Sequence, residues 1–182
     1  MPNREKNILL TGPPGCGKTT AIVKTAHLLH DLRVSGFHTE EIREDHERVG
    51  FRIVTFSGEK GILAHRSFTG GPRVSRYVVD VQGFERLALP AIDPALGGSA
   101  SKADAFIIDE IGKMECYSRA FQDAIRRLLD SPKPVLATIA LKGSGIIAEI
   151  KSREDVELIS ISAANRDSLP AELARKVGAL CR

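Results

Sequence analysis

The sequence predicts a three-layer α/β fold, in which a mostly parallel sheet lies between two layers of helices and carries an inserted antiparallel hairpin. Continuous apolar runs such as Asn7–Thr11, Ala105–Asp109 and Pro134–Ile139 alternate with segments of helical periodicity. Strands that are apolar on both sides are typical of a parallel sheet covered by helices. We expect a single domain over residues 1–182, because chains of this length commonly fold as one.

The first two elements are a strand and a helix. Asn7–Thr11 is expected to be a buried strand, and Thr20–Leu32 an amphipathic helix. His27 and His30 lie on this helix. We interpret them as solvated or partly buried side chains, since no second metal ligand is near them in the sequence.

A hairpin is predicted after this first strand and helix. Val34–Thr39, Val49–Phe56 and Gly61–His65 are the expected strands, and the turn Ser57–Gly61 joins the last two. The glycine-rich segment Thr69–Pro72 is expected to be a loop. The hairpin therefore interrupts an otherwise parallel pattern.

The rest of the chain returns to alternating strands and helices. Ser118 can cap a helix, and Pro90 and Pro94 are expected to divide the chain around them into short turns. The predicted strands are Tyr77–Val81, Ala105–Asp109, Pro134–Ile139 and Val156–Ile161, and the predicted helices are Gln82–Leu89, Arg119–Leu129, Ser144–Lys151 and Pro170–Leu180.

The most informative stretch is Gly12–Thr19, with the sequence Gly-Pro-Pro-Gly-Cys-Gly-Lys-Thr. A glycine, four residues and Gly-Lys-Thr form the pattern of the phosphate-binding P-loop. Its glycines let backbone N–H groups approach a phosphate chain, and the following helix directs its positive end at the anion. Lys18 can reach the β- and γ-phosphates, and the Thr19 hydroxyl can ligate Mg²⁺. A glycine-rich turn without a ligand would not need this complete motif between a strand and a helix.

A second group of residues adds catalysis to phosphate binding. Asp109 and Glu110 end an apolar strand, and the carboxyl ends of strands line the ligand crevice of such sheets. Asp109 can therefore hold Mg²⁺, and Glu110 can orient the attacking water. The alternative is that Glu110 only caps a backbone group or pairs with Lys113. Lys113 in turn can reach the phosphates or pair with Glu115.

Specific recognition of guanine is not predicted. Asp109–Gly112 fits the DxxG pattern of GTPases, but a pattern with two fixed residues occurs often by chance. The Asn-Lys-x-Asp guanine motif is missing, and Asn165–Asp167 has the wrong register for it.

Five segments resemble a known family, the small nucleoside-triphosphatases first described in hyperthermophiles, whose human member is called cancer-related nucleoside-triphosphatase. They are Gly12–Thr19, Ser35–Arg43, Arg73–Asp80, Asp109–Glu115 and Asn165–Asp167. The first is common to many P-loop proteins, whereas Asp-Glu-Ile-Gly-Lys-Met-Glu is far more specific. The resemblance implies a RecA-like P-loop fold, a monomer, and Mg²⁺-dependent hydrolysis of ATP, GTP and other nucleoside triphosphates with loose base selectivity.

The motifs and the resemblance together define a candidate site. Thr19 and Asp109 are the expected metal ligands, and Glu110, Lys18 and Arg73 the expected catalytic residues. The residues expected to contact the nucleotide are Gly12, Pro13, Pro14, Gly15, Cys16, Gly17, Lys18, Thr19, Thr20, Ile108, Asp109, Glu110, Ile111, Gly112, Lys113, Asn165 and Arg166.

Two pairs of residues have alternative interpretations. Arg73 and Arg76 flank a glycine-rich loop, where a guanidinium can act as an arginine finger on the γ-phosphate or remain a solvated cation. Asn165 and Arg166 follow the last predicted strand. They can contact the base, with Arg166 stacked on a purine, or form an ordinary loop before the last helix.

Composition limits which partners and which cell compartment are expected. The net charge is +3, from 26 basic and 23 acidic residues, and no basic tail is present, so nucleic acid is not expected as a partner. A stacking platform for single strands is also poorly supported, because Trp is absent and aromatic residues make up 5%. Neither a signal peptide nor a membrane span is predicted. Three cysteines without CxxC spacing are typical of reduced thiols in a cytoplasmic protein, and Cys16 is interpreted as a small filler in the P-loop.

Three classes of function remain, led by nucleoside triphosphatase. The alternative is a small-molecule or nucleotide kinase, which also needs an acceptor pocket and usually an arginine-rich lid. The hairpin carries Arg43, Arg48 and Arg52 and resembles such a lid in composition. Glu110 next to the metal ligand favours water as the acceptor. The third class is a nucleotide-binding or RNA-associated regulator without catalysis.

Overall fold

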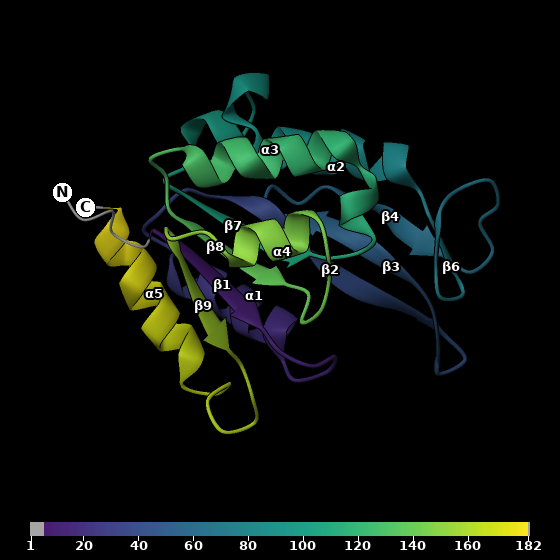
Figure 1. Ribbon diagram of the computed structural model, residues 1–182, viewed down its shortest axis with the longest axis horizontal. Coiled ribbons are helices and arrows are strands. Elements are labelled where there is room, and N and C mark those ends of the chain that lie inside the picture. Colours follow the sequence, from purple (N-terminus) through teal and green to yellow (C-terminus); the bar gives the residue numbers. More distant parts are fainter. Residues whose placement is uncertain (1–5, 182) are drawn as a thin grey trace.

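A single mixed sheet organises the protein, for which we use a computed structural model that describes residues 6–181 (Figure 1). Within these residues nine strands lie in the order β5-β6-β4-β3-β2-β7-β8-β1-β9. Their bounds are β1 Asn7–Thr11, β2 Val34–Glu44, β3 Glu47–Thr55, β4 Lys60–His65, β5 Arg73–Val74, β6 Tyr77–Val79, β7 Ala105–Ile111, β8 Val135–Ile139 and β9 Val156–Ser160. The expectation that the chain begins without a signal peptide concerns residues 1–5, which lie outside the described residues.

Five neighbouring strands, β2, β7, β8, β1 and β9, run parallel. Because β8 lies between β1 and β7, the strand that leads into the P-loop and the strand that ends in two acids are not neighbours. The carboxyl ends of parallel strands nevertheless lie along one edge of a sheet. Thr11 and Asp109 are therefore brought to the same edge.

Strand β2 joins the parallel strands to an antiparallel extension, which consists of β3, β4, β6 and β5. Its first residues, Val34–Phe37, pair with β7, and Phe37–Glu44 pair with β3. The turn between β2 and β3 contains Asp45 and His46, both with positive φ, as tight hairpin turns require. The inserted hairpin is thus confirmed, but it continues the main sheet and is longer than predicted.

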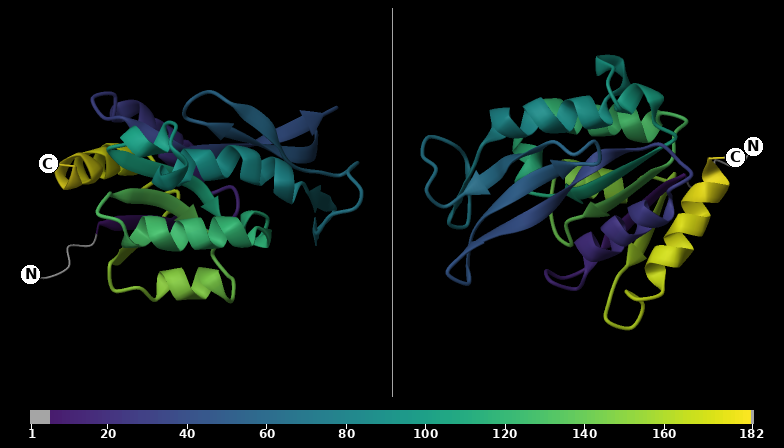
Figure 2. Two further views of the ribbon diagram at one scale, coloured as in Figure 1. Left: turned by 90° about the horizontal axis from the view of Figure 1, so that it is seen from above. Right: turned by 180° about the vertical axis from the view of Figure 1, so that it is seen from behind.

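Helices cover both faces of this sheet and complete three layers. Helices α1 (Lys18–Leu28) and α5 (Leu169–Leu180) pack together on one face, as Figure 2 shows. Helices α2 (Val81–Ile92), α3 (Arg119–Asp130) and α4 (Ile146–Lys151) bury their apolar residues against the other face. Short 3₁₀ turns are formed by Pro94–Leu96, Ala100–Lys102 and Glu115–Tyr117.

The predicted elements recur with shifted ends, and one local prediction was wrong. Pro90 does not open a turn, because α2 continues through it to Ile92. Pro90 lies in the last turn of that helix, and the buried side chains of Ala91 and Ile92 hold the helix together beyond it. Ser118 caps α3 as predicted, since its side chain accepts a hydrogen bond from the Phe121 N–H.

Two expectations about helices can be compared with the structure. His27, on α1, and His30, in the turn after its end at Leu28, are both exposed, as expected for solvated side chains. Among the helices within residues 6–181, none combines the length and the apolar composition that crossing a lipid bilayer requires.

Candidate active site

The P-loop forms the turn between β1 and α1. Gly17 directly precedes α1 with φ 104°, a left-handed conformation that favours glycine. No side chain caps the N-terminus of α1, so its first N–H groups and its positive dipole end can face an anion. Lys18 Nζ donates to the carbonyl oxygens of Gly12 (3.0 Å) and Pro13 (3.4 Å), which holds the ammonium over the loop. This arrangement fits a phosphate chain.

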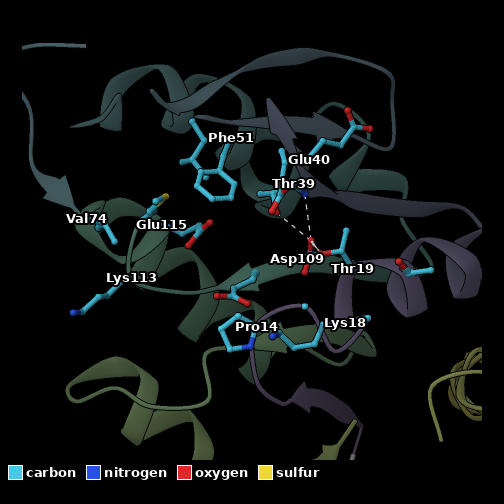
Figure 3. Close-up of a pocket in the computed structure, with 17 residues that line it drawn as sticks. Pro14, Lys18, Thr19, Thr39, Glu40, Phe51, Val74, Asp109, Lys113 and Glu115 are labelled. Atoms are coloured by element: carbon cyan, nitrogen blue, oxygen red, sulfur yellow. Dashed lines mark hydrogen bonds between the residues drawn. The ribbon is translucent and has the colours of Figure 1, made fainter. Parts of the chain in front are cut away.

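Asp109, at the end of β7, is held by hydroxyl groups from three elements. Its carboxylate accepts hydrogen bonds from Thr19 Oγ1 (2.8 Å), Thr39 Oγ1 (3.2 Å) and Thr138 Oγ1 (2.7 Å). Figure 3 shows the bonds from Thr19 and Thr39. The side chain is nearly inaccessible, at 1% exposure, and these donors compensate for its burial. The carboxylate is thereby fixed next to the hydroxyl of the P-loop threonine.

The oxygens of Asp109 and Thr19 fit a magnesium ion. Mg²⁺ prefers hard oxygen ligands and commonly takes only one or two from the protein, with waters and phosphates completing its shell. Within residues 6–181 no cluster of three or more His, Cys, Asp or Glu could hold a metal.

Glu110 and Glu115 lie next to each other across Gly112. Glu110 Oε1 is 2.6 Å, and Glu115 Oε2 2.9 Å, from the point where a Cβ at Gly112 would stand. A side chain at Gly112 would therefore collide with both carboxyl groups. Burial raises the pKa of Glu110, the Lys18 ammonium lowers it, and the charge of Asp109 raises it.

Glu115 is the more deeply buried of these two acids, with 5% exposure. Burial raises the pKa of Glu115 to about 8, and the negative charges of Glu110 and Asp109 contribute to the increase. At neutral pH the Glu115 carboxyl is therefore mostly protonated, whereas an ordinary glutamate is ionised.

These residues surround a cavity of about 760 Å³. It extends from the P-loop, across the end of β7, to the antiparallel extension (Figure 3). Its volume lies within the range of small-molecule sites, about 300–1,000 Å³. The lining residues are Pro14, Gly15, Gly17, Lys18, Thr19, Thr20, Thr39, Glu40, Glu41, Phe51, Leu63, Val74, Asp109, Glu110, Lys113, Met114 and Glu115.

Comparison with known proteins agrees with this geometry. A model of the protein family described as NTPase matches residues 7–174. The chain belongs to this family. It is 46% identical to the nucleoside-triphosphatase THEP1 of Thermofilum pendens, over 96% of this chain and 97% of that protein. It is 40% identical to the human cancer-related nucleoside-triphosphatase, over 90% of this chain and 92% of that protein.

Solved structures of the NTPase family share the fold. The crystal structure of THEP1 from Aquifex aeolicus has a TM-score of 0.82 and 38% identity, covering 92% of this chain and 96% of that one. The solution structure of the human cancer-related nucleoside triphosphatase has a TM-score of 0.78 and 38% identity, covering 95% and 97%. The predicted family and the predicted P-loop fold are both confirmed.

The structure brings about half of the residues predicted to contact a nucleotide to the cavity of this NTPase. Those that line it are Pro14, Gly15, Gly17, Lys18, Thr19, Thr20, Asp109, Glu110 and Lys113. Gly12 and Pro13 contribute the carbonyl oxygens that hold Lys18. Ile108 and Ile111 are core residues of β7 with no exposed surface. Cys16 packs beneath the P-loop against the core beside α1, consistent with a small filler.

Asn165 and Arg166 lie beside the P-loop and outside the cavity lining. The Asn165 side chain accepts from the Ser162 N–H (2.8 Å) and donates to the Ser160 carbonyl (2.9 Å), so it shapes its own loop. Arg166 Cδ is 3.5 Å from the point where a Cβ at Gly17 would stand. The aliphatic part of Arg166 therefore lies next to Gly17 of the P-loop.

The other candidate cations have different surroundings. Arg73 is exposed on β5, and its carbonyl oxygen accepts a hydrogen bond from the Tyr117 hydroxyl. Arg76 donates to the Arg48 carbonyl and to the Tyr77 hydroxyl. Figure 3 shows Lys113 pointing away from Glu115, and no charge of Lys113 contributes to the pKa of that acid. The pairing considered for Lys113 and Glu115 is thus not formed.

The arginines of the hairpin do not build a lid over the cavity. Arg43 and Arg48 both form ion pairs with Glu41, at 2.8 Å, and Arg52 lies 3.8 Å from Glu40. None of these arginines is among the residues that line the cavity.

The sequence analysis missed both threonines that hold Asp109 from neighbouring strands. Thr39 ended the first predicted strand of the hairpin, and Thr138 was the penultimate residue of another. One signal was available. Each threonine lies near the carboxyl end of a predicted strand, and that strand is a neighbour of the strand that carries the acid. This signal requires the strand order, which the sequence alone did not provide.

Proposed function

We propose that the protein hydrolyses nucleoside triphosphates to the diphosphate and phosphate, in the presence of Mg²⁺ and with little selectivity for the base. The observation that carries this proposal is the hydrogen bond of 2.8 Å between Thr19 and Asp109. It brings the two expected metal ligands together beside Lys18 and Glu110. The names of the relatives, which are nucleoside-triphosphatases, support the same reaction.

The P-loop would bind the phosphate chain. The uncapped N-terminus of α1 supplies backbone donors, and Lys18 can exchange its two carbonyl partners for β- and γ-phosphate oxygens. Charge-assisted hydrogen bonds of this kind are about twice as strong as neutral ones. The chain thus stabilises the charge that develops on the phosphates during transfer.

Thr19 and Asp109 would hold the metal ion. Bound there, Mg²⁺ would neutralise the charge that develops on the phosphate oxygens. The three threonines keep the Asp109 carboxylate in a fixed orientation. These hydrogen bonds also keep the Asp109 carboxylate from turning toward the attacking water. We therefore assign the orientation of that water to Glu110.

Glu110 would act as the general base. Its carboxyl group lies in the cavity near Lys18, which is expected to hold the γ-phosphate. A water that donates a hydrogen bond to Glu110 is then aligned for attack on phosphorus, and Glu110 accepts its proton. Because burial raises the pKa of Glu110, its ionised form is a stronger base than an exposed glutamate.

Weak base selectivity follows from where the nucleoside would lie. The phosphate chain runs from Glu110 past Lys18 toward Gly17, where the Arg166 side chain can stack on any base. The polar groups of Asn165 are already used within its loop. We also propose that the enzyme acts as a monomer, which sedimentation analysis can test.

The decisive experiment compares Glu110→Gln with the wild type in single-turnover hydrolysis of ATP and in nucleotide affinity. Glutamine keeps the shape of the side chain but cannot accept a proton, so we expect unchanged affinity and a loss of about 10²–10⁴-fold in the chemical step. Glu44→Gln, at the exposed end of β2, is the matched control and should hydrolyse normally. A loss below about threefold in Glu110→Gln would place the water-activating group elsewhere.

A further inference from the structure

The cavity contains a region that hydrolysis does not require. We call it the acceptor pocket and define it as Phe51 on β3, Leu63 on β4, Val74 on β5, and Met114 and Glu115 after β7. In Figure 3, Phe51, Val74 and Glu115 gather on the side of the cavity opposite Pro14 and Lys18. The antiparallel extension thus supplies most of this wall.

The phosphate chain of a nucleotide has no use for these side chains. Phosphates bind to N–H donors, cations and metal ions, whereas four of the five residues are apolar and the fifth is an acid. None of the five side chains carries a cation that could hold a further phosphate. The occupant of the acceptor pocket is therefore not an anion.

The acceptor pocket also lies on the attacking side of the γ-phosphate. Lys18 and Asp109 fix where the β- and γ-phosphates go, and the nucleoside leaves past Gly17 toward Arg166. Glu110 borders Glu115 across Gly112, and in the proposed function it would stand at the γ-phosphate end of the phosphate chain. A molecule in the acceptor pocket would therefore reach the γ-phosphorus where the attacking water is expected.

The size and polarity of the pocket indicate an organic molecule. The cavity of about 760 Å³ extends beyond the P-loop end to these side chains, so it offers room for more than a single water, which takes about 30 Å³ of liquid volume. Phe51, Val74 and Met114 pack against the core but remain partly exposed, so an apolar body would bury them further. Glu115 adds one buried polar group, whose carboxyl accepts hydrogen bonds only from the backbone within residues 6–181 and can still meet a ligand hydroxyl.

We propose that the acceptor pocket binds a small alcohol with an aromatic or branched aliphatic body, and that the protein transfers the γ-phosphoryl group to its hydroxyl. The hydroxyl oxygen forms a bond to the γ-phosphorus, and the bond from phosphorus to the β–γ bridging oxygen breaks. The nucleoside diphosphate leaves with that electron pair, and Glu110 accepts the hydroxyl proton. The products are a phosphate monoester, a nucleoside diphosphate and a proton.

This transfer rests on the hydrolytic site proposed above, because it uses the same phosphate, metal and base groups. Water and the alcohol then compete for one phosphoryl group. The share of ester among the products measures occupancy of the acceptor pocket, independently of the overall rate.

The experiment incubates the protein with Mg²⁺ and ATP and resolves phosphate monoester from inorganic phosphate by phosphorus NMR. The probes are benzyl, phenethyl and isoamyl alcohol, and glycerol provides primary hydroxyls without an apolar body. We expect at least one apolar alcohol to give an ester-to-phosphate ratio more than about 10-fold above that of glycerol at equal concentration, since each well-placed methylene group contributes roughly a factor of 10.

Variants locate the alcohol. Phe51→Ala should lower the ester-to-phosphate ratio about 10-fold or more, whereas Ile62→Ala, on the same strand as Leu63 but exposed at 41%, should leave it unchanged. Phe51→Trp is a second variant in case the first does not fold. Because the chain contains no other tryptophan, its emission reports folding, and the apolar alcohols should change that emission while glycerol does not.

Each outcome has a distinct meaning. Ester formation that prefers apolar alcohols and falls in the folded Phe51 variants supports the acceptor pocket. Release of inorganic phosphate alone, from every mixture, overturns the transfer and leaves hydrolysis standing. Equal ester formation from glycerol and from the apolar alcohols shows solvolysis without a pocket and also overturns it. If the wild type releases neither product, the proposed hydrolase fails as well.

Discussion

The two ends of the cavity are built on different principles. The P-loop end uses backbone N–H groups, Lys18 and hydroxyls at the carboxyl ends of parallel strands, all of which recognise phosphate whatever it is attached to. The end formed by the antiparallel extension presents apolar side chains such as Phe51 and Leu63. Features of the parallel fold thus suffice for binding an anion, whereas recognition of an organic body depends on strands added to that fold.

The acids between these two ends differ in how their charge is balanced. Asp109 receives hydrogen bonds from three hydroxyls. Around Glu110 and Glu115 burial outweighs the groups that favour the ionised form, and it raises the pKa of both. A proton is therefore held most easily on the side of the cavity that faces the antiparallel extension.

The largest expected effect tests the P-loop end. Lys18→Ala should reduce turnover by about 10³-fold, because the γ-phosphate loses its nearest fixed cation. Lys113→Ala is the matched control from the opposite rim of the cavity and should lose far less. Steady-state hydrolysis of ATP by both variants gives the comparison. Similar losses in the two would mean that the P-loop end has no special role.

A smaller effect is expected where the two ends meet. Asp109→Asn should raise the Mg²⁺ concentration for half-maximal hydrolysis by about 10-fold or more, because an amide is a weaker ligand than a carboxylate for a hard cation. Titration of the rate with Mg²⁺ at saturating ATP measures this shift. An unchanged half-saturation point, or full activity of the wild type in excess chelator, would contradict the assignment.

The nucleoside side of the P-loop should discriminate only weakly between bases. We expect kcat/KM values for ATP and GTP to agree within about 10-fold, since strong selectivity requires buried polar groups that the wrong base leaves unpaired. Parallel assays with a panel of nucleoside triphosphates provide the measurement. A ratio above about 10³ would reveal a selective base pocket.

The smallest effect concerns stability and pH at Glu115. Its pKa of about 8 in the folded protein exceeds the ordinary value of 4.5, so between these values the folded state keeps a proton that the unfolded chain has lost. Stability therefore falls as pH rises through this window, by up to about 1.4 kcal/mol per pH unit. Urea unfolding between pH 6 and 8 should show a shallower fall in Glu115→Gln than in the wild type or in Glu44→Gln. Equal slopes would show that Glu115 titrates normally.

Prediction from sequence succeeded where the information was local. The P-loop is one uninterrupted segment, and Asp109 and Glu110 follow directly on an apolar strand, so both could be assigned without knowing their neighbours. The partners of Asp109 are different, because Thr39 and Thr138 lie 70 and 29 residues away along the chain. Their roles depend on β2 and β8 both flanking β7, a strand order that local patterns do not encode.

The acceptor pocket illustrates the same limit. Phe51 and Leu63 fit the loose alternation of a hairpin, which indicates that one face is apolar but not what that face contacts. They lie opposite the P-loop because β2 pairs with β7 only through its first residues and with β3 along the rest of its length. The turn predicted at Pro90 was wrong for a related reason. The packing of Ala91 and Ile92 outweighs the low helix propensity of proline.

The position of β1 has a consequence for synthesis of the protein. β1 leaves the ribosome before the other strands of the described sheet, yet it pairs with β8 and β9, which end at Ile139 and Ser160. The hairpin of β2, β3 and β4 closes through contacts between nearby residues and can form early, whereas β1 must wait for most of the chain. A nascent chain that stops before Val135 would therefore contain the complete P-loop sequence and still be unable to retain a nucleotide.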